Sequence, residues 1–390
     1  MNKKSKTIIT LVLFALVAIL FLPIVGASFL FLSFENLPLV FIVLPFLLIG
    51  LIFMLIWFKK ERTFLIVFFS VISVFLLFSL SFLGIYVYKK IYIPSITIKE
   101  KPNGNVYEFL PFEANSLVAK LEAESSLKLN DAIPVLDGAT ALFPVYSSFA
   151  RACFPKDRCT LNEEGSALFY RNTVGSYNAL IDGDADLIFC AAPSKEQVEY
   201  AQSKNLSLKL TAIGKEAFVF FVNKANPIDS ISSRDLRKIY SGEIKNWKEL
   251  GGPDLKIKAF QRAKNSGSQS TLEKFMGDIP LMKAPSDERI DFMGGIVEQV
   301  QNYQNRRNSI GFSFRYFINE MQNAKDVKII KVDGVAPTVE NIKNGSYPLA
   351  SYFYAISTEK SKNVEALLNW ILSEQGQYLI EKTGYVGLQK

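Results

Sequence analysis

The sequence predicts an α/β protein with two lobes that follows an N-terminal three-helix transmembrane region. Two observations carry this prediction. Three long apolar runs fill the first quarter of the 390-residue chain, whereas from residue 132 onward short apolar segments alternate with helical patterns. This alternation is typical of strand–helix–strand units that build a sheet covered by helices. The remaining length, roughly 260 residues, exceeds what one hydrophobic core usually holds and therefore favours two lobes.

The membrane region is predicted for residues 1–96, with helices over about 8–32, 37–57 and 64–88. Each run is near or above the roughly 20 apolar residues that a membrane helix needs. Basic side chains lie before the first run (Lys3, Lys4, Lys6) and between the second and third (Lys59, Lys60, Arg62). The positive-inside rule then predicts a multi-pass plasma-membrane protein, in contact with the lipid bilayer, with a cytoplasmic N-terminus and an extracytoplasmic C-terminal domain. The alternative is that the first run is a signal peptide cleaved near Ala27, which exports the same domain.

The formal net charge of +7 is concentrated near the membrane. Residues up to Ile98 hold eight Lys or Arg and two acids, which leaves 36 basic and 35 acidic residues in the exported part. A nearly neutral domain lacks the basic surface that nucleic acids require, so we expect no nucleic-acid partner. The chain contains no histidine, the commonest general base and metal ligand, and we expect neither a metal nor a cofactor.

The exported part begins with a polar segment, residues 97–131, interrupted by Pro102 and Gly104, which predicts an extracytoplasmic stalk. The ligand-binding domain is predicted over residues 132–390, with lobe 1 over about 132–212 and 326–390 and lobe 2 over about 213–325. Strands are expected at 133–136, 167–170 and 187–190, and helices at 145–152, 176–181 and 195–204. Two apolar segments, 208–213 and 217–222, are candidates for strands that cross between the lobes.

The three cysteines divide into a pair and a single residue. Cys153 and Cys159 flank a short polar loop, and an oxidising exterior favours a disulfide between them. Cys190 ends an apolar run and is interpreted as a buried free thiol.

Residues 261–271 have the features of an anion-binding loop. Arg262 lies four residues ahead of Ser266-Gly267-Ser268, a turn that opens a helix predicted over 270–276. The first N–H groups of a helix have no partners within the helix and sit at its positive end, so an oxyanion there meets several donors. An arginine adds a bidentate charged fork. The alternative interpretation of the Ser-Gly-Ser segment is an ordinary turn and helix cap.

Several further pieces occur in a fixed order along the exported part: Asp137 to Pro144, Asn172 to Ser176, Ile239 to Trp247, Arg262 to Ser268, Ser309 to Phe312, Ser373 to Gln377 and Gly384 to Val386. Their order and spacing resemble the two-lobed substrate-binding proteins of bacterial ABC phosphate importers. The resemblance covers about residues 132–390 and implies a periplasmic-binding-protein type II fold. Within these pieces, Tyr240 and Trp247 are interpreted as packing aromatics.

The resemblance also implies a ligand shell. The first loop would contribute Thr140 and the N–H of Ala141, and the second the hydroxyl of Thr173. The third would contribute Arg262, Ser266, Gly267 and Ser268. The implied function is a membrane-tethered, extracytoplasmic protein that binds inorganic phosphate or a similar tetrahedral oxyanion for ABC-type uptake with permease subunits, and that is not an enzyme.

Two positions depart from the pattern of this family. Ala191 stands where well-studied members carry an aspartate that accepts the proton of hydrogen phosphate, and Lys264 falls near the family acid that steadies the arginine. We therefore expect weaker discrimination against sulfate, unless Asp137 or Glu216 supplies an acceptor. Lys264 is expected either to contact the ligand or to face solvent.

Two other functions are weighed against uptake. The domain could serve as an anion-sensing or adhesive ectodomain, for which Ala191 is the main support. A cell-surface Ser/Lys hydrolase would combine Ser266 or Ser268 with Lys264. The sequence lacks the Ser-x-x-Lys spacing and the nucleophile elbow typical of such enzymes.

Overall fold

The computed structural model describes residues 106–284, 289–290, 293–301, 307–322 and 324–388. The three predicted membrane helices and residues 97–105 of the predicted stalk lie outside these ranges. Among the helices that the structure describes, none has the length and apolar character required to cross a bilayer.

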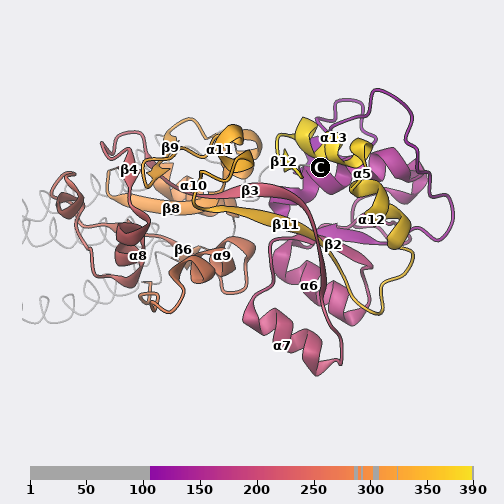
Figure 1. Ribbon diagram of the computed structural model, residues 1–390, viewed down its shortest axis with the longest axis horizontal. Coiled ribbons are helices and arrows are strands. Elements are labelled where there is room, and N and C mark those ends of the chain that lie inside the picture. The colour runs from indigo at the N-terminus through magenta and orange to yellow at the C-terminus, as the bar shows by residue number, and fades with distance from the viewer. Residues whose placement is uncertain (1–105, 285–288, 291–292, 302–306, 323, 389–390) are drawn as a thin grey trace, which may run out of the picture. The chain divides into compact units, whose positions relative to one another are not determined.

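A mixed sheet runs through both lobes. Its strands lie in the order β1 (Leu136–Gly138), β2 (Leu187–Cys190), β11 (Ala350–Ser357), β3 (Lys209–Asn223), β8 (Ser309–Phe314) and β5 (Lys258–Ala259). Strands β9 (Val327–Ile329) and β12 (Val386–Gly387) also pair with β3. Its central strand, β3 (Lys209–Asn223), is 15 residues long. The first part of β3, up to Ala217, pairs antiparallel with β11 (Ala350–Ser357), and the part from Phe218 onward pairs with β8 (Ser309–Phe314). The two strands predicted at 208–213 and 217–222 are therefore one continuous strand that crosses between the lobes, as Figure 1 shows.

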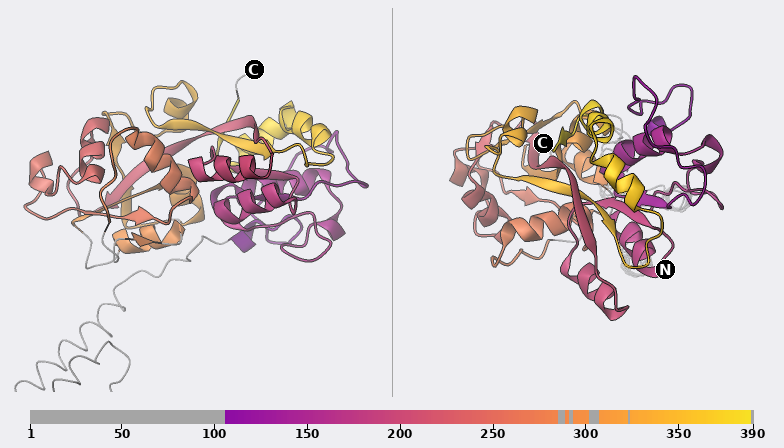
Figure 2. Two further views of the ribbon diagram at one scale, coloured as in Figure 1. Left: turned by 90° about the horizontal axis from the view of Figure 1, so that it is seen from below. Right: turned by 45° about the vertical axis from the view of Figure 1, so that its right-hand side comes forward.

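Lobe 1 surrounds the first part of β3 and contains the N-terminal and C-terminal segments of the described chain (Figures 1 and 2). Its parallel pair β1–β2 lies beside β11, and the first strand begins later than predicted. Its elements are η2 (Val106–Phe109), β1 (Leu136–Gly138), η3 (Thr140–Leu142), α5 (Phe143–Cys153), η4 (Lys156–Arg158), α6 (Asn172–Asp182), β2 (Leu187–Cys190), α7 (Lys195–Ser203), α12 (Glu365–Ile371), α13 (Glu374–Thr383) and β12 (Val386–Gly387).

The second predicted strand of lobe 1, at 167–170, pairs with β1 through an isolated bridge between Leu168 and Leu136. The amide of Phe169 donates to Leu136 O (2.8 Å) and the amide of Leu136 donates to Ala167 O (2.8 Å). The prediction at 187–190 is confirmed by β2, and the predicted helices at 145–152, 176–181 and 195–204 correspond to α5, α6 and α7.

Lobe 2 surrounds the part of β3 from Phe218 onward, where the run Phe218 to Val222 is buried on both faces of the sheet. Such continuous apolar runs are typical of strands covered on both sides. Its elements are β4 (Ser230–Ile231), α8 (Ser233–Ser241), η5 (Trp247–Leu250), β5 (Lys258–Ala259), β6 (Gln261–Arg262), α9 (Gly267–Met276), β7 (Arg289–Ile290), α10 (Met293–Gln301), β8, η8 (Phe317–Met321), β9 (Val327–Ile329), β10 (Lys331–Val332) and α11 (Val339–Lys343).

The chain leaves lobe 1 along β3 and returns along β11. The return lies further along the chain than the predicted position near residue 326, because β9 still pairs with the lobe 2 part of β3 and β10 pairs with β4. The amide of Phe218 donates to Leu349 O (3.0 Å), which joins the outgoing and returning segments where the lobes meet. The connection between the lobes is thus a two-stranded ribbon.

The part of the predicted stalk that the structure describes packs against lobe 1. Val106 and Phe109 of η2 are buried in the main hydrophobic core. Ser147 Oγ of α5 donates a hydrogen bond to Phe109 O, and Ser126 donates through its amide to Gln375 Oε1 (2.8 Å) at the start of α13. Residues 106–131 therefore belong to the folded lobe.

Aromatic side chains fill the core of each lobe. In lobe 2, Tyr240 lies with its ring centroid 5.5 Å from that of Phe220 and 5.7 Å from that of Phe312. Trp247 is fully buried, and its Nε1 donates to Asn308 O (3.0 Å). The interpretation of Tyr240 and Trp247 as packing residues is confirmed.

The three cysteines are free and buried, so the predicted Cys153–Cys159 disulfide is not formed in the structure. Cys153 Sγ lies 3.7 Å from Ser125 Oγ and forms a hydrogen bond with it instead. Burial raises the pKa of Cys153 and of Cys159 to about 12. The prediction of a buried free thiol at Cys190 is confirmed.

Candidate functional site

A pocket lies between the two lobes beside the β3–β11 ribbon. Its volume is about 400 Å³, including space open to solvent. Ala141, Thr173 and Ala191 line it from lobe 1, Gly267 lines it from lobe 2, and Glu216 lines it from β3. Residues from all three predicted ligand loops thus meet in one place.

The first loop connects β1 to α5 through the short helix η3. Gly138 ends β1, and a side chain there would collide with Phe189 O and Tyr146 Cε1, each 2.7 Å from an ideal Cβ. Thr140 begins η3, is buried, and shares a hydrogen bond with the hydroxyl of Tyr170 (3.1 Å). Ala141 O accepts a hydrogen bond from the hydroxyl of Tyr385. Both hydrogen bonds hold η3 in position at the pocket wall.

The second loop opens α6, which begins at Asn172, earlier than predicted. Asn172 has a positive φ of 59°, a conformation that asparagine tolerates better than most residues. Its Oδ1 accepts from the amides of Val174 (3.0 Å) and Gly175 (3.3 Å) in the first turn, and the next residue, Thr173, lines the pocket.

Asp137 joins the first two loops from a fully buried position. Its Oδ1 accepts from the amide of Gly138 (2.7 Å), the amide of Arg171 (2.9 Å) and the hydroxyl of Ser176 (3.0 Å). Its Oδ2 forms an ion pair with Arg171 Nη1 (2.7 Å). Burial raises the pKa of Asp137, and these donors act in the opposite direction. The carboxylate therefore fixes the second loop against the end of β1.

The third loop runs from β6 into α9, which begins at Gly267 and not at Ser270 as predicted. Ser266 is the N-cap, and its hydroxyl accepts from the amide of Gln269 (3.4 Å). The amide of Arg262 donates to Gln269 Oε1 (2.9 Å), and Arg262 Nη1 donates to Ser268 Oγ (3.5 Å). Arg262 is only 8% exposed, so its charge lies largely away from bulk water.

Tyr170 lies close enough to Arg262 for the arginine to affect its ionisation. Burial raises the pKa of Tyr170, while the hydrogen bond to Thr140 and the charge of Arg262 lower it. The hydroxyl therefore remains protonated near neutral pH and is available as a donor. Tyr170, of lobe 1, thus connects the first loop electrostatically to the arginine of lobe 2.

The lobes touch at the mouth of the pocket. An ideal Cβ at Gly267 would lie 3.0 Å from Thr173 Oγ1, so only a glycine permits this approach without displacing the threonine. Gln197 Nε2 donates to Asn265 O (3.4 Å) across the lobes. Beside it, Lys264 Nζ forms an ion pair with Glu196 Oε1 (2.5 Å).

Lys264 was expected either to contact the ligand or to face solvent, and the structure shows it in this ion pair. The side chain is 66% exposed, as expected for a surface lysine, but it binds a carboxylate of the opposite lobe. The pair raises the pKa of Lys264 and lowers that of Glu196. Lys264 therefore ties the two rims of the pocket together.

The two acids named as replacements for the missing aspartate differ in position. Asp137 is occupied by the donors described above and does not line the pocket, whereas Glu216 does. Ala191 lines the pocket through its small side chain, and its carbonyl accepts from the hydroxyl of Tyr177 (2.7 Å). Among the described residues, no group of acids and cysteines suits a metal ion.

The structure thus brings Ala141, Thr173 and Gly267 to one pocket, with Thr140, Arg262, Ser266 and Ser268 on the same loops. Sequence reasoning missed Tyr170 and Tyr385, which bind the first loop, and Arg171, which binds Asp137. Their partners are distant in sequence, so no local pattern identifies them.

Comparison with known proteins agrees with this architecture. Residues 136–375 match the family model described as a PBP superfamily domain. The phosphate-binding protein PstS of Borreliella burgdorferi is 26% identical over 273 residues, which cover 67% of this chain and 91% of that protein. Protein SphX of Synechococcus elongatus is 26% identical over 275 residues, covering 66% of this chain and 78% of that protein.

One solved structure supports the fold. It is a candidate phosphate ABC transporter substrate-binding protein from Clostridium perfringens with bound phosphate, and it is 23% identical to this chain with a TM-score of 0.50. The match covers 66% of this chain and 99% of that one.

Proposed function

Because the chain belongs to the PBP superfamily, we propose that it is an extracytoplasmic protein that binds inorganic phosphate for ABC-type uptake. The observation that carries this proposal is the meeting of three helix-opening loops from two lobes at one pocket. The names of the relatives PstS and SphX and the phosphate in the Clostridium perfringens structure support phosphate as the ligand.

The site can hold a dehydrated oxyanion with groups that the chain itself supplies. Helix openings at η3, α6 and α9 offer backbone N–H donors and the positive ends of helix dipoles. The hydroxyls of Thr140, Thr173, Ser266 and Ser268 add donors, since a hydroxyl that already accepts one hydrogen bond still has a proton to donate. Arg262 offers charge-assisted hydrogen bonds from a buried position, where water competes less.

The arrangement of the lobes supports capture by closure. Thr140, Ala141 and Thr173 belong to lobe 1, whereas Arg262 to Ser268 belong to lobe 2, so the shell is complete only when the lobes meet. The β3–β11 ribbon is the element about which they move, as in other proteins that close around a ligand. Delivery would follow when a permease favours the open form, and we propose ABC permease subunits as the partner.

The chain is a binding protein and not an enzyme. A Ser/Lys hydrolase would need Lys264 to activate Ser266 or Ser268, but Lys264 Nζ binds Glu196. The relatives named above are binding proteins by name.

We further propose that the domain is tethered to the membrane by residues 8–32, 37–57 and 64–88. These runs have the length and composition of membrane helices, and the basic residues around them favour an exported domain. Tethering would keep the binding protein beside its permease.

Isothermal titration calorimetry of the full-length chain in detergent tests the proposed function. We expect one phosphate to bind per chain. If neither phosphate nor sulfate, arsenate or molybdate binds, uptake is refuted, and the alternative of an ectodomain without ligand gains support.

A further inference from the structure

We propose that Glu216 is the acid that distinguishes hydrogen phosphate from sulfate. It would take the role of the aspartate that was expected at the position of Ala191. This inference rests on the proposed function. It assigns a specificity-determining role to a residue of the inter-lobe strand β3, outside the three ligand loops.

The position of Glu216 is the first argument. Of the described residues that line the pocket, Glu216 is the one carboxylic acid, and it shares the pocket with Ala141, Thr173 and Gly267 of the three loops. It lies on β3 opposite Ser351 of β11, at the ribbon that joins the lobes. Ala191 lines the same pocket with a methyl group, which leaves the acceptor role to another residue.

The rival acid, Asp137, is already engaged. Its two carboxylate oxygens receive three hydrogen bonds and an ion pair from residues of lobe 1, and it is absent from the described lining of the pocket. Asp137 therefore positions the loops, whereas Glu216 faces the space that they enclose.

Glu216 keeps acceptor capacity for a ligand. Its Oε1 accepts from the amide of Ala217 (2.7 Å) and its Oε2 from the amide of Tyr316 (3.2 Å). Arg315 Nε lies 3.6 Å from Oε1, beyond the usual length of an N–H···O hydrogen bond. Because a carboxylate offers about four lone-pair sites, the two amides leave room for a P–OH donor.

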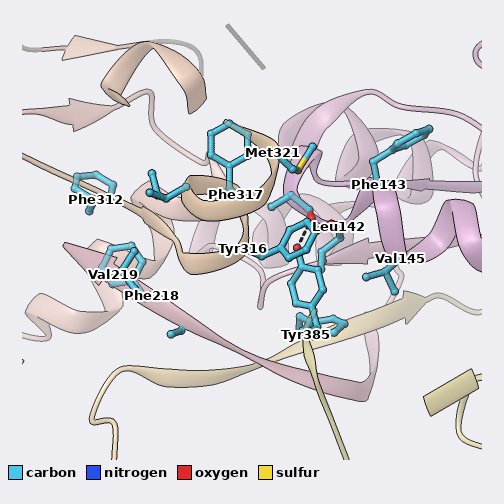
Figure 3. Close-up of a cluster of buried hydrophobic side chains, with 14 of the residues drawn as sticks. Leu142, Phe143, Val145, Phe218, Val219, Phe312, Tyr316, Phe317, Met321 and Tyr385 are labelled. Carbon is cyan, nitrogen blue, oxygen red and sulfur yellow. Dashed lines mark hydrogen bonds between the residues drawn. The ribbon is translucent and has the colours of Figure 1, made fainter. Parts of the chain in front are cut away.

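The surroundings of Glu216 connect it to the first ligand loop. Tyr385 stacks on Tyr316 with ring centroids 4.5 Å apart, and Figure 3 shows the two rings beside Leu142. The hydroxyl of Tyr385 binds Ala141 O. Arg315, which pairs with Glu216, also donates to Gly384 O (2.6 Å). The carboxylate thus lies in a network that contains one edge of the ligand shell.

The protonation of Glu216 is adjustable near neutral pH. Its side chain is almost fully buried, and this burial raises its pKa to about 7. Arg315 and the amides of Ala217 and Tyr316 act in the opposite direction. The other titratable groups that face it are Tyr316, Tyr347 and Tyr385, whose pKa values burial raises further. Glu216 is therefore the group of this wall that titrates between pH 6 and 8.

The two protonation states treat the two anions differently. Ionised Glu216 accepts a hydrogen bond from the proton of hydrogen phosphate, whereas sulfate has no proton and would face a carboxylate of like charge. Neutral Glu216 can donate its own proton to a sulfate oxygen. Sulfate should therefore bind mainly to the neutral form, and phosphate should be preferred more strongly as the pH rises.

Sulfate serves as the probe because it does not titrate near neutral pH, and because the chain contains no histidine that would titrate there. We would measure sulfate and phosphate affinities of the full-length chain in detergent by calorimetry at pH 6, 7 and 8. For a group with a pKa near 7, the neutral fraction falls about tenfold between pH 6 and 8, and sulfate affinity should fall by the same factor.

Glu216→Gln should remove this pH dependence. Its amide can donate to sulfate at any pH, so sulfate affinity at pH 8 should rise at least tenfold and the phosphate-to-sulfate ratio should fall. Glu359→Gln is the matched control, because Glu359 binds Ser207 on the exposed surface of lobe 1 and should change neither affinity. Unfolding curves of both variants separate a loss of fold from a change of selectivity.

Each outcome is decisive. A flat sulfate profile in the wild type, or a Glu216→Gln variant that rejects sulfate as the wild type does, overturns the role of Glu216 while phosphate binding stands. If Glu216→Gln does not fold, the wild-type sulfate profile alone decides. Failure of the wild type to bind either anion at any pH refutes the proposed function itself.

Discussion

Replacing Arg262 with alanine is the sharpest test of the ligand shell. Arg262 is the buried basic residue of the third loop, since it is 8% exposed whereas the side chain of Lys264 is 66% exposed. Hydrogen bonds to a charged group contribute about 1.5–3 kcal/mol each, so a two-pronged contact contributes about 3–6 kcal/mol. At about 1.4 kcal/mol per tenfold change, phosphate affinity should fall roughly 10²- to 10⁴-fold.

The fold should survive this change. The loop is held by the amide of Arg262, which donates to Gln269 Oε1, and by the Ser266 cap, and neither contact needs the guanidinium. Arg262→Lys should fall between wild type and alanine, because lysine keeps the charge but cannot form the planar fork.

Arg237→Ala is a matched control in the same lobe. Arg237 donates from Nε to Phe275 O (2.9 Å), and its guanidinium lies 4.4 Å from the centre of the Phe275 ring. Arg237→Ala should lower thermal stability and leave phosphate affinity unchanged. Arg262→Ala should lower phosphate affinity and leave thermal stability unchanged. Calorimetry and thermal unfolding of the full chain measure both. Phosphate affinity of Arg262→Ala within threefold of wild type would refute the proposed site.

Three further results are expected. Lys264→Glu should weaken phosphate binding a few-fold at low salt, because it places two like charges together at Glu196. Adding Glu196→Lys should restore the affinity. An unchanged affinity in the single variant would contradict a role for this contact between the lobes. The pKa of Glu216 is higher in the folded chain than its usual 4.5, so the folded state binds a proton more tightly than the unfolded state does. The free energy of unfolding, measured in urea, should therefore fall by up to about 3 kcal/mol as the pH rises from 4.5 to 7 and then level off. Glu216→Gln should flatten this profile. Protease added to intact cells should remove the domain that follows residue 97, and protection of that domain would contradict its export.

The order of the ligand loops could be predicted from the sequence because each loop carries its own local signal. Gly138 lies just before η3, Asn172 opens α6 and Ser266 caps α9, and the requirements of a helix start are local. The same reasoning divided β3 in two, because Gly214 and Lys215 interrupt its apolar pattern. Pairing with β11 continues through both residues, with Gly214 opposite Phe353 and Lys215 opposite Tyr352. Pairing with the neighbouring strand therefore makes β3 continuous, although its local sequence pattern is interrupted.

Contacts between segments that are distant in the sequence could not be predicted either, because no local pattern reports them. Lys264 and Glu196 meet only because the two lobes approach each other, and the sequence around either residue is that of an ordinary exposed helix or turn. Asp137-Gly138 resembles a simple turn, yet the carboxylate reaches Arg171 and Ser176 of another loop. The return of the chain to lobe 1 was placed too early because short strands such as β9 carry little pattern of their own.

The bonds of Asp137 have a kinetic consequence. Since one buried carboxylate locks the first two loops together, the lobe 1 half of the shell is already assembled before any anion arrives. Once the lobes are apart, an encounter with that rigid half requires no rearrangement, so lobe 2 should affect the association rate through the fraction of molecules that are open. The rims that meet at Thr173 and Gly267 must part before the anion escapes, and the residence time of the ligand is therefore governed by how often lobe 2 swings away.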